Sequence, residues 1–196
     1  MSTRLIAYVL FLLIASSIAR LSWAQSAGAS VSKSPSPLAA EKNPPGDIPD
    51  NQAFVEYKSP LGFSIKVPEG WARREQVSNV SFSDKYNRVQ VTVTAQATPP
   101  TLASIKMNEV TALQKLPIAV RIGSVKQFAM PAGSVVVVHY GANSEVNAVT
   151  NKAIRQDNEN YYFWNAGKLA VLTLSAPAGA DNVDQWQLMA KSFTWR

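Results

Sequence analysis

The chain has 196 residues, of which 46% are hydrophobic and 16% are charged, and its formal net charge is +6. These proportions are typical of a soluble globular protein and exclude a disordered or fibrous chain. The absence of cysteine excludes disulfides, thiolate metal sites and a thiol nucleophile, and a single histidine, His139, excludes a metal site made of several histidines.

Residues 1–24 have the features of a secretory signal peptide. Arg4 gives a positive start, Leu5–Ala15 is apolar except for one tyrosine hydroxyl, and Ser22-Trp23-Ala24 places small residues where a signal peptidase requires them. The alternative is a retained membrane anchor, but the apolar run is shorter than the roughly 20 residues of a membrane span, and Arg20 lies where a span would have to continue. We therefore expect export to the periplasm or the cell exterior, cleavage before Gln25, and no stable membrane insertion afterwards.

Residues 25–52 form a linker rich in proline, serine and alanine. The linker holds five of the twelve prolines of the chain and shows no apolar periodicity. Such a segment cannot bury enough surface to order itself, so we expect a disordered tether, either a spacer or simply a loose N-terminus. The remaining residues, 53–196, are sufficient for one domain with its own core.

Strand patterns, in which apolar and polar residues alternate, fill most of this domain. The predicted strands are Phe54–Tyr57, Phe63–Pro68, Val77–Ser83, Arg88–Gln96, Val120–Ala129, Ser134–Tyr140, Ala148–Asn165 and Leu169–Leu174. The run Val135–Val138 contains no polar residue, so we expect its strand to be covered on both faces.

Two helices are predicted among these strands. Thr101 is a suitable N-cap for a helix over Leu102–Leu116, which Pro117 ends. Asp181 is the predicted N-cap of a C-terminal helix with one narrow apolar face. The expected fold is α+β, an antiparallel β-sheet sandwiched between helices in an α/β/α arrangement.

Several segments resemble the PsbP/Mog1-like superfamily over nearly all of 53–196. Gly62–Trp71, Val80–Asp84 and Arg88–Thr94 resemble the opening of that family, and Ala166–Pro177 and Ser192–Trp195 are similar to its ending. The shared motifs are structural, made of turn glycines, a proline, core aliphatics and aromatics. The resemblance implies an α/β/α sandwich that binds or assembles and does not catalyse. Family members include lumenal extrinsic subunits of photosystem II, a Ran-binding transport factor and many exported bacterial proteins. A thylakoid lumen is therefore the expected location if the source is photosynthetic.

Alternation places His139 on the strand face that also carries Val135 and Val137. A catalytic histidine needs a nucleophile within hydrogen-bond reach and a carboxylate that orients it, and no nucleophile-elbow motif is present. We interpret His139 as a partly buried histidine hydrogen-bonded to backbone or water. An enzyme would come back into consideration if His139 lay in a cleft with a carboxylate and a hydroxyl in reach.

Asp157 and Glu159 share one face of a predicted strand, and Glu145 lies before it. Paired carboxylates can hold a hard cation or exchange protons. The polar run Arg155–Asn160 is instead typical of a hairpin tip, and it does not match a calcium loop. We therefore predict no metal site and no cofactor.

The candidate binding residues are two aromatic and two basic side chains. Tyr162 and Trp164 share the face opposite Tyr161 and Phe163, so one pair is expected in the core and the other as an exposed anchor, unless helices cover both. Arg73 and Arg74 follow Trp71 on a predicted exposed connection, where they are either contacts for an acidic partner or part of a solvated loop.

The sequence thus predicts a non-enzymatic, exported envelope accessory protein that binds an envelope protein or complex. The alternative is a carrier for a small ligand or a lipid, with a pocket between the sheet and a helix. The basic residues form no run that could neutralise a row of phosphates, so we expect no nucleic-acid partner. A closed core with an exposed aromatic patch would favour protein docking, and a lined cavity would favour the carrier.

Overall fold

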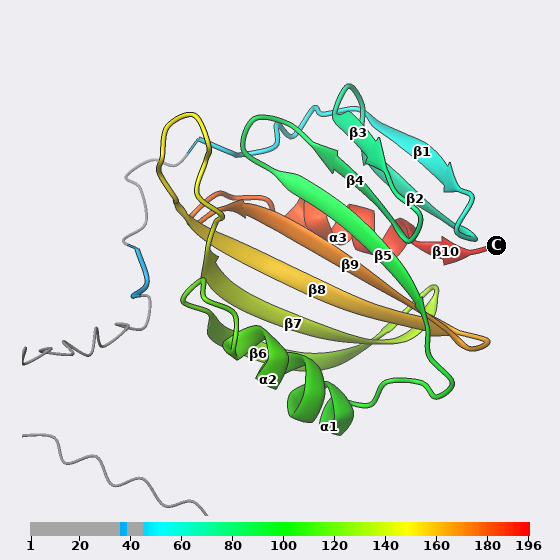
Figure 1. Ribbon diagram of the computed structural model, residues 1–196. Helices are drawn as coiled ribbons and strands as arrows, with labels where there is room; N and C mark the ends of the chain where they lie inside the picture. Colours follow the sequence, from blue (N-terminus) through cyan, green and yellow to red (C-terminus); the bar gives the residue numbers. More distant parts are fainter. Residues whose placement is uncertain (1–35, 39–44) are drawn as a thin grey trace, which may run out of the picture. The chain divides into compact units, whose positions relative to one another are not determined.

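The computed structural model describes residues 36–38 and 45–196 (Figure 1). The predicted signal peptide, 1–24, and most of the predicted linker lie outside these residues. No helix within the described ranges is long and apolar enough to span a membrane. The body consists of two antiparallel sheets and two helical segments, so the mostly antiparallel α+β fold predicted from the sequence is confirmed.

The larger sheet has seven strands in the spatial order β3-β4-β5-β9-β8-β7-β6. In chain order these strands are β3 (Ala72–Glu75), β4 (Asn79–Ser83), β5 (Arg88–Ala95), β6 (Arg121–Met130), β7 (Gly133–Asn143), β8 (Arg155–Asn165) and β9 (Lys168–Pro177). The long central strands β7, β8 and β9 pair with their neighbours in register over most of their length.

The smaller sheet has three strands, β1 (Phe54–Ser59), β2 (Phe63–Pro68) and β10 (Thr194–Trp195). Strands β1 and β2 form the predicted hairpin, with Tyr57 opposite Ile65. The predicted inner face of β2 is confirmed, because Phe63, Ile65 and Val67 are at most 3% exposed.

The first helical segment contains α1 (Leu102–Ile105), a π-helical turn (Lys106–Val110) and α2 (Thr111–Gln114). Its predicted start is confirmed by a capping box, in which Thr101 and Ser104 each accept the backbone N–H of the other, at 3.0 and 2.9 Å. The second, α3 (Val183–Ser192), is followed directly by β10.

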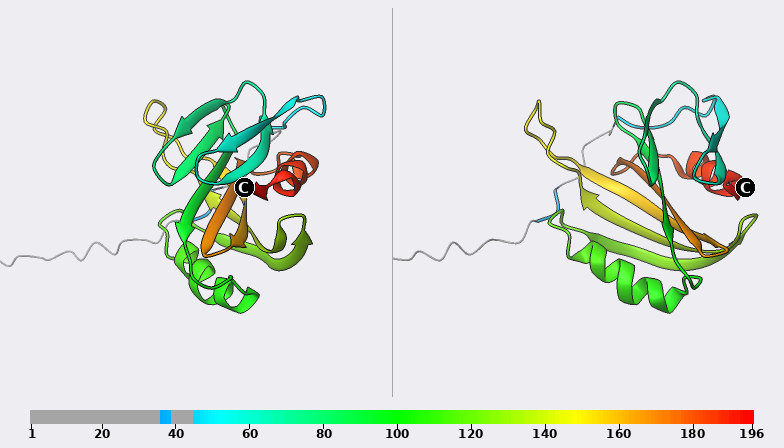
Figure 2. Two further views of the ribbon diagram at one scale, coloured as in Figure 1. Left: turned by 90° about the vertical axis from the view of Figure 1, so that its right-hand side faces the viewer. Right: turned by 45° about the vertical axis from the view of Figure 1, so that its right-hand side comes forward.

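The four valines of β7 divide between two hydrophobic cores, as their uninterrupted run predicted. Val135 and Val137 belong to a core that includes α3, and Val136 and Val138 belong to a core that includes the α1–α2 segment. Each valine is at most 6% exposed. Figure 2 shows the α1–α2 segment in green and α3 in red on different sides of the large sheet.

Two segments differ most clearly from the sequence prediction. Strand β8 begins at Arg155 and not at Ala148, because Asn147 forms a turn in which its Oδ1 accepts the backbone N–H groups of Val149 and Thr150. The predicted connection at Arg73 and Arg74 is instead β3, an edge strand paired with β4.

The end of the predicted linker packs against the body. Ile48 is 4% exposed, and its N–H donates to Oδ1 of Asn182 at 2.7 Å. The Asn182 amide also donates to the carbonyl of Gly46, at 2.9 Å. We call residues 46–48 the strap. Asn182, not Asp181, occupies the N-cap position of α3, and its side chain bonds the strap instead of the helix.

We predict that Asn182→Ala lowers the free energy of unfolding by about 1–3 kcal/mol, because it leaves the buried N–H of Ile48 without an acceptor. Urea denaturation of the full-length protein measures this change. Asp181→Ala is the matched control, and we expect a loss below about 0.5 kcal/mol because Asp181 is exposed. A larger loss in Asp181→Ala than in Asn182→Ala would contradict this assignment.

Candidate functional site

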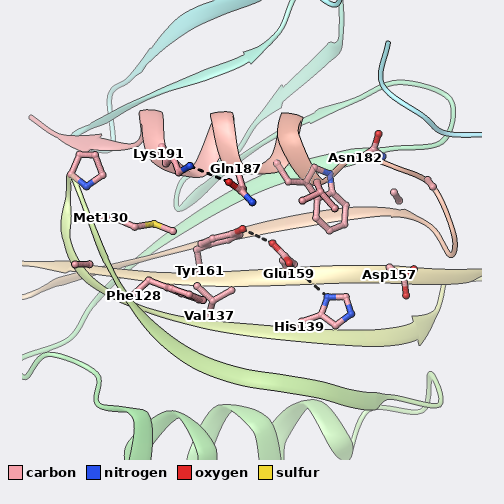
Figure 3. Close-up of a pocket in the computed structure, with 16 residues that line it drawn as sticks. Phe128, Met130, Val137, His139, Asp157, Glu159, Tyr161, Asn182, Gln187 and Lys191 are labelled. Atoms are coloured by element: carbon pink, nitrogen blue, oxygen red, sulfur yellow. Dashed lines mark hydrogen bonds and ion pairs between the residues drawn. The ribbon is translucent and has the colours of Figure 1, made fainter. Parts of the chain in front are cut away.

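A cavity of about 530 Å³ lies between the large sheet and α3 (Figure 3). Its lining comes from the tip of the β6–β7 hairpin, from the central strands, and from the flank of α3. The sixteen lining residues are Phe128, Ala129, Met130, Pro131, Val137, His139, Asp157, Glu159, Tyr161, Ala176, Ala180, Asn182, Val183, Trp186, Gln187 and Lys191.

The position of α3 explains why this part of the sheet is open. The end of α3 is fixed to the small sheet, because Ser192 Oγ accepts the backbone N–H of Lys66 at 2.8 Å. The hydroxyls of Thr194, in β10, and Ser64, in β2, are also 2.8 Å apart. The helix therefore fills the space next to β2, and its other flank faces β7, β8 and the β6–β7 hairpin across the cavity.

A polar cluster lies on the cavity floor, which the strands provide. His139 of β7 stands directly opposite Glu159 of β8 in the register. Its Nδ1 is 3.7 Å from Oε1 of Glu159, and the hydroxyl of Tyr161 donates a hydrogen bond to the other carboxylate oxygen. The side chains of His139 and Glu159 are 43% and 25% exposed, so both are partly open to the cavity.

The neighbouring strand leaves room for the imidazole. Gly123 lies at a bulge of β6 between Ile122 and Ser124. A Cβ atom at Gly123 would lie 2.7 Å from Cδ2 of His139, which is closer than two carbon atoms can approach. Glycine at this position therefore permits the observed orientation of His139 toward Glu159.

Burial raises the pKa of Tyr161 well above its ordinary value, and the hydrogen bond to Glu159 raises it further. The hydroxyl is therefore protonated at neutral pH and acts as a donor. It holds the Glu159 carboxylate in one place on the cavity floor.

The other end of the cavity is apolar and carries one cation. Phe128 and Met130 of the β6–β7 hairpin line this end. Lys191 lies at this end, and its ammonium donates to Oε1 of Gln187 at 3.0 Å (Figure 3). The cavity thus has apolar walls with a few polar groups at fixed positions, as in sites for small amphipathic molecules.

The cavity meets part of the condition set above for an enzyme, because His139 lies in a cleft with a carboxylate and a hydroxyl nearby. The hydroxyl, however, donates to Glu159 and not to His139. Among the described residues that line the cavity there is no serine or threonine to act as a nucleophile. The described residues also contain no group of three or more metal-ligating side chains.

Tyr162 and Trp164 are not the exposed pair considered above. Tyr162 is 2% exposed and belongs to the core beneath the α1–α2 segment, where burial raises its pKa to about 12. Trp164 is partly buried against the same core and donates its indole N–H to the carbonyl of Gln96 at 2.8 Å. Tyr161 and Phe163 belong to the core on the other face. Both pairs are therefore covered, and Tyr162 cannot serve as an exposed anchor.

Arg73 and Arg74 are exposed on β3, and neither of them lines the cavity. Arg73 is paired with Glu75 at 3.2 Å, and its guanidinium carbon lies 5.4 Å from the centre of the Tyr57 ring. These contacts place Arg73 beside a smaller hollow of about 350 Å³, separate from the cavity.

The run Arg155–Asn160 is not a hairpin tip, because it forms the first half of β8 in the middle of the large sheet. Asp157 and Glu159 share one face, as alternation predicted, and both line the cavity. The cavity residues on α3 and on the β6–β7 hairpin had no functional signal in the sequence, since they resemble ordinary helix and strand residues.

Comparison with known proteins identifies the fold. No protein-family model and no curated protein sequence matches the chain. The solution structure of cyanobacterial PsbP (CyanoP) from Synechocystis sp. PCC 6803 superposes with a TM-score of 0.54 at 15% identity, covering 74% of this chain and 94% of that chain. A protein from Bacteroides thetaiotaomicron has a TM-score of 0.50 at 10% identity, covering 72% of this chain and 48% of that chain.

The Ran-binding protein Mog1p of Saccharomyces cerevisiae has a TM-score of 0.49 at 10% identity, covering 72% of this chain and 95% of that chain. The match to cyanobacterial PsbP confirms the PsbP/Mog1-like fold expected from the sequence. At 15% identity or less the likeness extends to the fold alone.

We predict that the stability of the protein falls less steeply with rising pH in Tyr161→Phe than in the wild type. Because the folded state raises the pKa of Tyr161, its stabilising effect is complete below about pH 10 and is lost above it, where the unfolded chain ionises first. The loss amounts to about 1.4 kcal/mol per pH unit for one proton.

Urea denaturation between pH 7 and pH 11 measures these slopes. Tyr57, Tyr140 and Tyr162, whose pKa values are also raised, contribute equally to both proteins. Equal slopes for Tyr161→Phe and the wild type would show that the hydroxyl is not buried.

Proposed function

We propose that this chain is a non-enzymatic binding protein that takes a small amphipathic molecule into the cavity between β7, β8 and α3. The observation that supports this proposal is the cavity itself, whose volume of about 530 Å³ lies in the range of small-molecule sites. Its walls are mainly aliphatic and aromatic, and its polar groups occur on a few strand and helix positions. The sequence features of a signal peptide make export part of the proposal.

A lined cavity favours the ligand carrier over docking through an exposed aromatic face. The aromatic run of β8 is covered on both faces, so it offers no docking patch. The cavity, in contrast, is open to solvent at side chains that could contact a ligand, including His139 and Glu159.

Docking to an envelope protein is the second candidate, and one observation favours it. Two apolar residues of the cavity lining, Phe128 and Val183, are 45% and 60% exposed. Exposed apolar side chains at the edge of a hollow are typical of protein interfaces as well as of ligand entrances. A partner that inserts an apolar side chain would use the same cavity.

Binding without catalysis is part of the proposal. Nucleophilic catalysis requires an activated hydroxyl or thiol beside a base, and the described lining residues offer only the Tyr161 hydroxyl. Its raised pKa makes Tyr161 a poor nucleophile at neutral pH. The polar cluster is therefore better suited to orienting a ligand than to attacking it.

We predict that the full-length protein binds the uncharged dye Nile red at one saturable site, with the blue shift in emission that an apolar environment causes. Val137→Phe, which adds a ring to the cavity floor, is expected to weaken binding roughly tenfold, equivalent to about 1.4 kcal/mol. Fluorescence titration measures both. Ala176→Leu adds bulk from β9 and serves as a second variant.

Val55→Phe is the matched control, since Val55 lies on β1, is 42% exposed and does not line this cavity. The control should bind like the wild type, and thermal unfolding should show that each variant is folded. Absence of saturable binding, or equal binding by the folded Val137→Phe and Ala176→Leu variants, would rule out this cavity as the site.

A further inference from the structure

The charges that line the cavity are unevenly distributed. Asp157 and Glu159 project from β8 toward one end, and Lys191 lies toward the other, at the last turn of α3 (Figure 3). Lys191 is already hydrogen-bonded to Gln187. The two carboxylates therefore face the cavity without a lysine or arginine close to them.

His139 cannot neutralise both carboxylates. It is the one ion-pair partner of Glu159 within the described part of the chain, and a histidine carries at most one positive charge. Asp157 has no ion-pair partner among the described residues and accepts only the backbone N–H of Gly179, at 3.1 Å. This end of the cavity keeps a net negative charge whether or not His139 is protonated.

Arg155 is the nearest cation along β8, but it is held elsewhere. Its guanidinium donates to the carbonyl of Ala119 at 2.8 Å and to Oδ1 of Asn143 at 3.2 Å. It lies against Gly141 and is not part of the cavity lining. Neither Asp157 nor Glu159 therefore forms an ion pair with a lysine or arginine of the described residues.

The walls of the cavity are mainly aromatic and aliphatic. Trp186 and Tyr161 both line the cavity, and aromatic faces attract organic cations as well as apolar groups. A bare metal ion would not use such walls, and the described residues provide no group of three ligands for one. An apolar body with one cationic group would use both features.

We infer that the ligand of this cavity is an amphipathic organic cation, an amine whose ammonium group lies against Asp157 and Glu159 and whose apolar body fills the space between Trp186 and the β6–β7 hairpin. The inference rests on the proposed function, since it names the chemical class of the ligand for the same cavity. Tyr161 acts as a positioning residue, because its hydroxyl fixes one oxygen of Glu159 and leaves the other facing the cavity and His139.

The test compares three probes with the same eight-carbon chain: octylamine, octanol and octanoate. Each displaces Nile red from the full-length protein at pH 7, and the ring signals of the single histidine report contact with the polar cluster by NMR. Octylamine is expected to bind roughly tenfold more tightly than octanol, since its charge is attracted to the carboxylates and desolvation offsets only part of that attraction. Octanoate is expected to bind most weakly.

Asp157→Asn and Glu159→Gln should each weaken octylamine binding and leave octanol binding within twofold. Asp157→Asn tests the inference even if loss of the Tyr161 contact unfolds Glu159→Gln, because Asp157 makes only a backbone contact. Asp184→Asn is the matched control, an exposed acid of α3 outside the cavity, and should bind all three probes like the wild type.

Equal displacement by octylamine and octanol, or stronger displacement by octanoate, would overturn the inference and leave the proposed function standing. Displacement by octylamine that is unchanged in folded Asp157→Asn and Glu159→Gln would also overturn it. If neither Nile red nor any of the three probes bound, the proposed function would fail together with the inference.

Discussion

The whole architecture depends on one constraint, the need to cover both faces of the central strand β7. Four consecutive valines allow no solvent-exposed face, since alternate side chains point to opposite sides of a sheet. One set contributes to the core with α3 and the other to the core with the α1–α2 segment. Each buried valine contributes about 1.5–3 kcal/mol of hydrophobic free energy, so neither cover can be removed without a large cost.

The cavity is a consequence of how one of these covers is attached. The hydrogen bonds that join Ser192 and Thr194 to β2 fix the end of α3, so the helix contacts both the small and the large sheet. It therefore does not cover β7 and β8 along their whole length. The polar cluster of His139, Glu159 and Tyr161 occupies the part of the face that stays open. Charged side chains can remain there because they keep contact with solvent, whereas a sealed core would require them to be neutral or fully paired.

Local patterns in the sequence were sufficient for the parts of the fold that depend on neighbouring residues. The β1–β2 hairpin, the capped start at Thr101 and the two-sided burial of Val135–Val138 were all predicted from alternation and capping. Alternation also placed His139 on the correct face, and Asp157 and Glu159 on a common face. The pairing of His139 with Glu159 was not predictable, because it depends on the register of two strands that are separated by a long loop. The polar composition of Arg155–Asn160 suggested a turn. These polar residues occur in a central strand because Asp157 and Glu159 line a cavity, and the sequence does not reveal that cavity.

The strap gives the N-terminal part of the chain a mechanical connection to the cavity. Gly46 and Ile48 hold Asn182, and Asn182 is both the first residue before α3 and part of the cavity lining. Tension applied to the chain from its N-terminal side would reach the hydrogen bonds of Ser36 and Leu38 with Asn143 of β7 first, and the two hydrogen bonds of the strap next. A molecule bound in the cavity and tension on the N-terminal segment would then both act on the side-chain amide of Asn182.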